Sequence, residues 1–243
     1  MKILAATNNK HKVEEFRNIL KDTGVEIISQ EELGKELPDI PEDGETFEEN
    51  AGIKALGFAK FAGLTVIADD SGLEIRALDG APGIYSARYA ETNDKRIEKV
   101  LRELKKKCQR DKTEECQSVS VSKCQGGKTE DRSGFGNRKT GDQQLTTDNQ
   151  RLTTDDRAAR FVCVIALASP EKVIATFRGE VYGRIGYEPK GSGGFGYDPV
   201  FIPDGYDRTF AELGADIKDK ISHRANALKK LDEFLAGIAR CDQ

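Results

Sequence analysis

Two adjacent carboxylates, Asp69 and Asp70, follow an apolar run and are followed in turn by Ser71 and Gly72. Because an unpaired carboxylate is costly to bury, charge at the end of a buried strand indicates positioned chemistry. Successive strand residues point to opposite faces, so we expect one carboxylate to face a cleft and the other to brace a turn. We predict a metal-dependent active site. The alternative is a strand that simply ends in an Asp-Ser-Gly turn.

A second acidic cluster lies in residues 41–50, where five carboxylates surround Gly44. Acidic residues also favour a helix N-terminus, so helix-start electrostatics is the alternative explanation. Mg²⁺ prefers one or two carboxylates together with waters and substrate phosphates, which suits a sparse acidic site. We therefore predict that Glu42 and Asp70 hold a divalent cation, with Asp69 as a further candidate ligand.

The segment Thr7–Lys12 joins the first expected strand to the first expected helix. Free backbone N–H groups, the positive end of the helix dipole and two lysines together suit a polyphosphate. The segment lacks the glycines and the Gly-Lys-Ser/Thr ending of a P-loop. The alternative is that Asn8 or Asn9 caps a helix whose lysines are solvated.

A glycine-rich run at residues 191–196 matches the spacing G-x-G-x-x-G, but an extended apolar run follows it instead of a helix. It is therefore not read as a dinucleotide fingerprint. Such a loop can approach a flat ligand while Phe195 or Tyr197 stacks on it and Asp198 accepts hydrogen bonds. A plain flexible loop is the alternative.

His223 and Arg224 open the last expected helix. A cation at a helix N-terminus is electrostatically unfavourable, so Arg224 points to an anionic or carbonyl-rich ligand. Solvation at the surface is the alternative explanation. Lys218 and Lys220 precede the motif and add further positive charge.

The elements that must position these residues alternate between helical and strand patterns. Apolar spacing predicts helices at 10–20, from Thr46 to Gly63, around 97–104 and around 227–235, and strands at 2–7, 64–69, 73–78, 161–168 and 173–184. The last two strands read as a hairpin, and Thr46 with Glu49 reads as a capping box. The pattern predicts a mixed α/β fold with at least one antiparallel pair.

The composition suits one large soluble domain or two small ones, with 243 residues, 37% hydrophobic and 33% charged. A net charge of -4 gives no sequence-wide attraction to nucleic acid or to an anionic membrane, so we expect neither as a partner. No apolar stretch approaches the roughly 20 residues of a membrane span, and no signal-peptide core follows Met1. We expect a cytoplasmic protein with reduced thiols.

Residues 107–156 differ in kind from the rest, since only eight of these 50 residues are hydrophobic. That number is too small for a core, so we predict a disordered insertion. A near-tandem repeat at 144–150 and 151–155 suggests local duplication. Three cysteines here are spaced by eight without a Cys-x-x-Cys or a nearby histidine, so a zinc site is not favoured. A long surface insertion need not unfold its host.

Six motifs, taken in order, resemble the inosine triphosphate pyrophosphatase family. They are Thr7–Lys10, Glu42–Asn50, Ala68–Leu73, Gly80–Arg88, Gly193–Pro199 and Ser222–Arg224. The resemblance implies an elongated two-lobed α/β domain with a long mixed sheet and a central cleft, usually assembled as a homodimer. It covers the chain except residues 107–156, which implies one catalytic domain made of residues 1–106 and 157–243.

The same resemblance implies Mg²⁺-dependent hydrolysis of the non-canonical purine nucleoside triphosphates ITP, dITP and XTP to the monophosphate and pyrophosphate, which cleanses the nucleotide pool. Carried over residue by residue, Asp70 is the general base and a metal ligand, Glu42 is the second metal carboxylate, and Asp69 supports them. The implied substrate-binding residues are Thr7, Asn8, Asn9, Lys10, His11 and Lys12 for the phosphates, and Ser71, Phe195, Gly196, Tyr197, Asp198, Lys218, His223 and Arg224 for ribose and base.

Base choice follows from hydrogen-bond chemistry. Inosine and xanthosine present a 6-keto acceptor where adenine presents an amino donor, and donors near Arg224 would leave that amino group unpaired. Two other functions stay open at this point. One is a pyrophosphatase for modified pyrimidine nucleotides. The other is a non-catalytic nucleotide sensor, for which loss of Asp70 or Glu42 would be expected.

Overall fold

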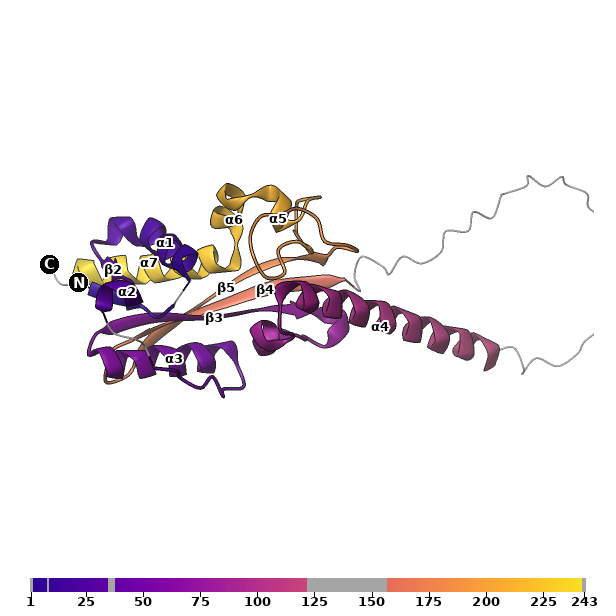
Figure 1. Ribbon diagram of the computed structural model, residues 1–243, viewed down its shortest axis with the longest axis horizontal. Helices are drawn as coiled ribbons and strands as arrows, with labels where there is room; N and C mark the ends of the chain where they lie inside the picture. The colour runs from indigo at the N-terminus through magenta and orange to yellow at the C-terminus, as the bar shows by residue number, and fades with distance from the viewer. Residues whose placement is uncertain (1, 8, 35–37, 122–156, 242–243) are drawn as a thin grey trace, which may run out of the picture.

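The computed structural model describes residues 2–7, 9–34, 38–121 and 157–241, which form an elongated α/β structure around one six-stranded sheet (Figure 1). The strand order is β2-β1-β3-β4-β5-β6. The strands are β1 (Lys2–Ala5), β2 (Glu26–Ile28), β3 (Thr65–Ile75), β4 (Ala158–Ala168), β5 (Val173–Ile185) and β6 (Phe201–Pro203). β1 pairs in parallel with β2 and β3, and every later pairing is antiparallel. The expected mixed α/β class is confirmed.

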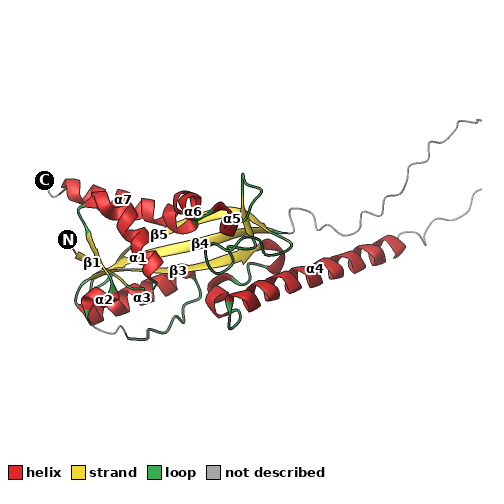
Figure 2. Ribbon diagram, turned by 45° about the horizontal axis from the view of Figure 1, so that its top comes forward, coloured by secondary structure: helices red, strands yellow, loops and turns green. Residues whose placement is uncertain are grey.

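Helices cover both faces of the sheet (Figures 1 and 2). They are α1 (Lys10–Leu20), α2 (Gln30–Leu33), α3 (Phe47–Ala62), α4 (Asn93–Val121), α5 (Phe210–Leu213), α6 (Ala215–Ile221) and α7 (His223–Cys241), with 3-10 turns at Lys21–Thr23, Arg76–Leu78 and Gly83–Arg88. None of the described helices is long and apolar enough to cross a membrane.

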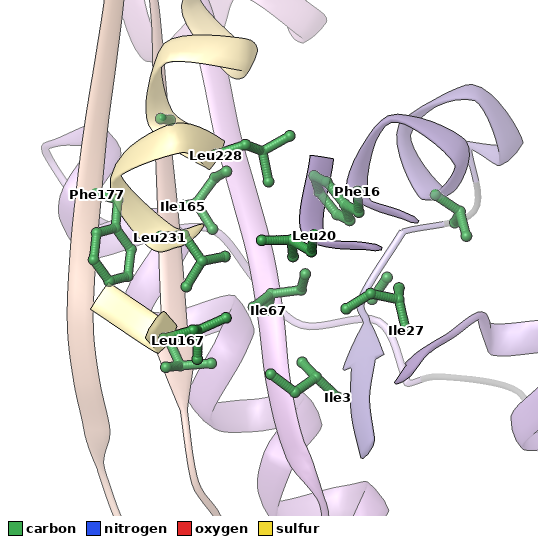
Figure 3. Packing of buried hydrophobic residues seen from close by; sticks show 14 of the residues in the cluster. Ile3, Phe16, Leu20, Ile27, Ile67, Ile165, Leu167, Phe177, Leu228 and Leu231 are labelled. Atoms are coloured by element: carbon green, nitrogen blue, oxygen red, sulfur yellow. The ribbon is translucent and has the colours of Figure 1, made fainter. Parts of the chain in front are cut away.

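Helices α1 and α7 bury their apolar stripes against one face of the sheet (Figure 3). Phe16 of α1 and Leu228 of α7 meet Ile67 of β3 and Ile165 of β4 in a single buried cluster. Both helices therefore rest on the side chains that alternate to this face, since strand residues two apart share a face. The apolar spacing at 10–20 and 227–235 predicted the two helices, and the structure shows what their apolar stripes pack against.

Helix α3 covers the other face, on which Val66 and Ala68 of β3 and Val164 of β4 lie. Four of its seven buried residues are alanine or glycine, which allows the helix to lie close to the strands. Thr46 caps the helix by accepting a hydrogen bond from Glu49 N at 3.1 Å, as predicted. The capping box is only half formed, because the Glu49 carboxylate accepts from Glu45 N at 2.7 Å instead of from Thr46.

Strand β3 does not end at the two aspartates, so the alternative of an Asp-Ser-Gly turn is wrong. The expected turn beside the aspartates and the separate strand expected at 73–78 are wrong for the same reason. Strand β3 continues to Ile75, with Asp70 opposite Val164 and Gly72 opposite Val162 of β4. Gly72 serves close packing and not a turn, because a Cβ there would collide with the carbonyl oxygen of Gly83. The aspartates consequently sit in the middle of a long, rigid strand.

Residues 107–156 were predicted to be disordered, but helix α4 continues through the first part of this segment to Val121. Lysine, glutamate and glutamine have high helix propensity, and a helix already packed through Val100 and Leu104 can propagate without a core of its own. The remainder of the predicted insertion, residues 122–156, lies outside the described residues, and so do Cys124 and the repeat.

The two ends of the insertion are neighbours in space. Burial lowers the pKa of the Arg157 guanidinium, and the Cys108 thiol lies close enough to oppose that decrease. Arg157 is buried and donates from Nε to Ile185 O at 2.6 Å, which fixes the point where the chain re-enters the sheet. A short connection can therefore span this gap.

We expect that replacing residues 110–156 with a short Gly/Ser linker leaves the fold and the enzymatic turnover largely intact. Only seven of these 47 residues are hydrophobic, which is too few for a core, and the cost of closing a loop changes slowly with its length. Thermal unfolding and turnover of the shortened chain test this. A collapse of the melting transition, or loss of turnover in a folded variant, would assign the segment a role in the domain.

Candidate active site

Asp69 is buried at the centre of an ion-pair network that joins α1, β3 and α7. Its two carboxylate oxygens accept from Lys12 Nζ at 3.0 and 2.9 Å, and Oδ2 also accepts from Ser71 Oγ at 3.0 Å. Arg224 Nε and Nη2 each lie 3.4 Å from the same oxygen. Burial alone would raise the pKa of Asp69, but Lys12, Arg224 and Lys54 together hold this pKa well below its usual range. Asp69 is therefore ionised.

The positive charge of Arg224 at the start of α7 is balanced from within the protein. Besides Asp69, its Nη1 donates to Glu15 Oε2 of α1 at 2.9 Å. The Arg224 side chain is 2% exposed, so it is not solvated at the surface. The unfavourable position next to the helix N-terminus is explained first by these two carboxylates and not by a ligand.

Asp70 points to the opposite face of β3, as the strand alternation predicted. There it lies near Glu42, near Asn50 of α3 and near Lys54 of the same helix, all of which act on its pKa. Lys54 Nζ forms an ion pair with Glu42 Oε1 at 2.7 Å and donates to Asp69 O at 3.1 Å. Two carboxylates and one ammonium group therefore face one another on this side of the strand.

The Asp70 carboxylate is poised to exchange a proton near neutral pH. Burial, and then the negative charge of Glu42, raise its pKa to about 6 against the opposing charge of Lys54. Its Oδ1 accepts from Ser71 N at 2.9 Å, while Oδ2 is buried and has no hydrogen-bond partner among the described residues. A buried carboxylate oxygen left free in this way is suited to bind water or a cation.

Two cavities open on either side of these aspartates. One of about 370 Å³ is lined by the charged side chains of Asp39, Glu42 and Lys54, together with polar and apolar residues that include Thr7, Gln30 and Phe58. The other, of about 190 Å³, is lined by Lys12 and Ser71 and by the aromatic side chains near the glycine-rich loop. The charged cavity suits phosphates and a cation, and the aromatic one suits a flat base.

Phe195 at the tip of the glycine-rich loop forms one wall of the aromatic cavity and is 41% exposed. Its backbone N donates to Asp198 Oδ2 at 2.7 Å, which ties the loop to itself. Lys218 Nζ pairs with the same oxygen at 2.6 Å and lies 4.1 Å from the centre of the Phe195 ring. Gly194 has φ +73°, so this tight turn favours glycine.

His223 lines the same cavity as a neutral side chain. Its ring stacks on Phe161 with a centroid distance of 4.8 Å and an interplanar angle of 13°. Burial, reinforced by the charges of Arg224 and Lys218, lowers its pKa well below the ordinary value. Its Nδ1 is buried without a hydrogen-bond partner among the described residues, so the ring still has capacity for a polar ligand.

The chain is similar in sequence and in structure to known proteins. A model of the Ham1 family matches residues 3–137 and 132–234, which is most of the chain. The chain belongs to the Ham1 family. The resemblance stated from the six motifs is thereby confirmed.

Relatives in the Ham1 family match over nearly their whole length. A protein of Oceanobacillus iheyensis named dITP/XTP pyrophosphatase is 42% identical over 240 residues, covering 98% of this chain and 99% of its own. One of Bacillus subtilis with the same name is 41% identical, covering 96% of each chain. Among solved structures, a HAM1 protein from Coxiella burnetii aligns with a TM-score of 0.72 and 35% identity, covering 98% of this chain and 99% of its own. The Staphylococcus aureus Ham1 protein aligns with a TM-score of 0.70 and 37% identity, covering 98% of this chain and 99% of its own.

The segment that carries the predicted phosphate ligands of this Ham1 chain leads into α1. Thr7 lines the charged cavity and its Oγ1 accepts from Asn9 N at 3.2 Å, while Lys12 reaches Asp69. Lys10 forms an exposed ion pair with Glu31 at 2.9 Å, away from the aspartates' ion pairs. Asn8 and the side chain of His11 lie outside the described residues.

The predicted base-binding residues come together in the aromatic cavity. Its lining includes Ser71, Phe195, Gly196, Tyr197, Asp198, Lys218, His223 and Arg224. Tyr197 is buried and donates from its hydroxyl to Ser86 O at 3.0 Å, so it serves as a wall and not as an open stacking surface. Of the two aromatic candidates, the exposed Phe195 is the one available to stack on a ligand.

The structure adds residues that sequence reasoning missed. Lys54 and Asn50 complete the surroundings of Asp70, and Glu15 holds Arg224. A signal for the first two exists: they lie four apart within the otherwise apolar face of α3, where buried polar side chains call for a reason. Glu15 carried no comparable signal, because its partner is 209 residues away in the chain.

Proposed function

We propose that this protein hydrolyses non-canonical purine nucleoside triphosphates, namely ITP, dITP and XTP, to the monophosphate and pyrophosphate. The observation that carries the proposal is the pair of carboxylates Asp70 and Glu42 facing Lys54, with Asp70 Oδ2 buried and unpartnered. The names of the dITP/XTP pyrophosphatases at about 40% identity support the same chemistry. Both carboxylates are present, which disfavours a non-catalytic sensor.

The residues around Asp70 fit Mg²⁺ better than a metal that needs a protein cage. Within the described ranges, no three His, Cys, Asp or Glu side chains are grouped to hold a metal ion. Mg²⁺ commonly uses only one or two carboxylates together with substrate phosphates, and Glu42 with the free Oδ2 of Asp70 would supply them. When bound, Mg²⁺ would neutralise charge on the phosphates. We leave Asp69 out of this ligand set, because its oxygens are already held by Lys12, Ser71 and Arg224.

In the proposed reaction Asp70 acts as the general base. Its ionised carboxylate accepts a proton from the water that attacks the α-phosphorus, and the bond from this phosphorus to the departing pyrophosphate oxygen breaks. Lys54, which lies beside Asp70 and pairs with Glu42, stabilises the negative charge that accumulates on the departing group. On the other face of β3, Asp69 holds Lys12 and Arg224 at the aromatic cavity.

Base choice is assigned to the donors in the aromatic cavity. Lys218, His223 and Arg224 would face a 6-keto oxygen while Phe195 stacks on the ring. Because Arg224 already pairs with two carboxylates, we assign the selection of the base jointly to Arg224, to Lys218 and to His223, whose ring is neutral. An adenine amino group would meet donors there and stay unpaired, at a cost of about 1–3 kcal/mol.

The experiment that tests the proposal is product analysis with a panel of triphosphates and Mg²⁺. We expect ITP to yield IMP and pyrophosphate, with ATP cleaved at least about 10-fold less efficiently. Release of orthophosphate with IDP as the other product would refute the assignment. Preference for a modified pyrimidine triphosphate would favour the second function left open by the sequence.

We further propose a homodimer, a cytoplasmic location and no nucleic-acid partner. The first two are carried over from the family resemblance and the absence of a long apolar segment in the sequence. The third rests on the net charge of -4, which gives no general attraction for a polyanion. We also propose that residues 1–106 and 157–243 form the single catalytic domain, with 107–156 as its insertion.

A further inference from the structure

One cation in the aromatic cavity has no role in the site described above. The cavity is lined by four cationic side chains, Lys12, Arg96, Lys218 and Arg224. Carboxylates pair with three of them, namely Lys12, Lys218 and Arg224. Arg96, in the first turns of α4, has no carboxylate partner within the part of the chain that the structure describes. Its charge is therefore available to a ligand.

Neutral acceptors hold the Arg96 side chain in place. Its Nε donates to Ala90 O and its Nη1 donates to Asn93 Oδ1, both at 2.9 Å. These bonds use two of the five N–H donors of a guanidinium group, which has no acceptor. The remaining donors have no partner among the described residues, and the side chain is half-buried. The group is thus oriented but not neutralised.

Arg96 lines the cavity proposed for the base and not the cavity proposed for the phosphates. It lies close enough to the Tyr197 phenol to oppose the rise in pKa that burial causes there. The cavity that it lines contains Phe195, Phe161 and Tyr197, whereas Glu42 and Lys54 line the separate charged cavity. Arg96 reaches this space from α4, while the donors assigned to the 6-keto oxygen come from α6 and α7.

Recognition of the 6-keto oxygen leaves one problem, because guanine carries the same group. The three 6-keto purines differ at position 2, where hypoxanthine has hydrogen, xanthine has a keto oxygen and guanine has an amino group. A side chain with donors only would bind the xanthine oxygen, tolerate the hypoxanthine hydrogen and leave the guanine amino group without an acceptor. Arg96 has this property.

We propose that Arg96, oriented by Asn93, contacts the 2 position of the purine and separates xanthine and hypoxanthine nucleotides from guanine nucleotides. This inference rests on the proposed function and deepens it. It assigns rejection of GTP to α4, and rejection of ATP to α6 and α7. A useful consequence is that the two selectivities can be changed independently.

The test compares kcat/KM for XTP, ITP and GTP in the wild type and in Arg96→Met, which keeps an unbranched stem but removes every donor. We expect the XTP to ITP ratio to fall about 10-fold and the GTP to ITP ratio to rise about 10-fold, as for one buried polar contact. Arg102→Met is the matched control, because Arg102 is exposed on the same helix and outside the cavity lining, and both ratios should stay as in the wild type.

Ratios in Arg96→Met within twofold of the wild type would overturn the inference, and so would an equal loss on all three substrates. If Arg96→Met does not fold, Arg96→Gln is measured instead, since its amide oxygen accepts from the guanine amino group and should still raise the GTP to ITP ratio. If the wild type cleaves none of these triphosphates, the proposed function fails. Calorimetric binding of XMP, IMP and GMP then decides the inference: equal wild-type affinities would overturn it, and weaker GMP binding that Arg96→Met relieves would support it.

Discussion

Replacing Asp70 by Asn should lower turnover at least about 100-fold while the protein stays folded. Asparagine keeps the shape of the side chain but removes the proton acceptor, and general-base catalysis contributes on the order of 10²- to 10⁴-fold. The fold should tolerate the change because burial raises the pKa of Asp70 to about 6, so its charged form is the disfavoured one. Lys54 keeps its ion pair with Glu42. Steady-state kinetics on ITP and a thermal melt measure both effects.

The same assignment fixes the pH dependence of the wild type. With a pKa raised to about 6, Asp70 in the free enzyme is ionised above that pH and protonated below it, so kcat/KM should fall as pH decreases through about 6. Any residual turnover of Asp70→Asn should not show this decrease in kcat/KM. A folded Asp70→Asn variant with near-normal turnover and the same decrease in kcat/KM near pH 6 would exclude Asp70 as the general base.

Replacing Asp69 by Asn should instead destabilise the protein, by about 3–5 kcal/mol in the free energy of unfolding. The change removes one partner of a buried ionic network and leaves Lys12 and the almost fully buried Arg224 without their shared carboxylate. Urea denaturation at neutral pH gives the size of the effect. The exposed Glu31→Gln variant, which breaks the surface pair with Lys10, is the control and should unfold much like the wild type.

Acid unfolding tests how the contribution of Asp69 to stability changes with pH. Because Lys12, Arg224 and Lys54 lower the pKa of Asp69, its ionised form stabilises the folded state at neutral pH and this contribution is lost as pH falls below the ordinary aspartate range. The difference in stability between wild type and Asp69→Asn should therefore shrink in acid. A difference that is small at pH 7, or that does not change with pH, would contradict the assigned network.

Several features of the site follow from local patterns that neighbouring residues produce. The bounds of α1 match the predicted 10–20, and α3 begins after Thr46 and is capped by Gly63 as expected. The alternation of strand side chains placed Asp69 and Asp70 on opposite faces. Each of these depends on spacing and capping within a few residues, so the sequence alone was sufficient.

The sheet decided what the residues around Asp69 and Asp70 do. Pairing with β4 holds β3 straight through the aspartates, so the predicted turn does not form. The contact from Asp69 to Arg224 joins residues 155 positions apart, and that from Arg224 to Glu15 spans 209. No local periodicity encodes such distances, because they depend on strand register and on how α1 and α7 pack together.

By itself, then, the sequence determined the motifs, the mixed α/β class and the two carboxylates that carry the proposed chemistry. Only the tertiary structure decided which charges are neutralised inside the protein and which remain for a ligand. The sequence marks Arg224 as an unpaired cation, but two carboxylates pair with it. Arg96 belongs to none of the sequence motifs, and it has no carboxylate partner among the described residues. The physical reason is that the availability of a charge depends on its neighbours in space, and packing sets these neighbours.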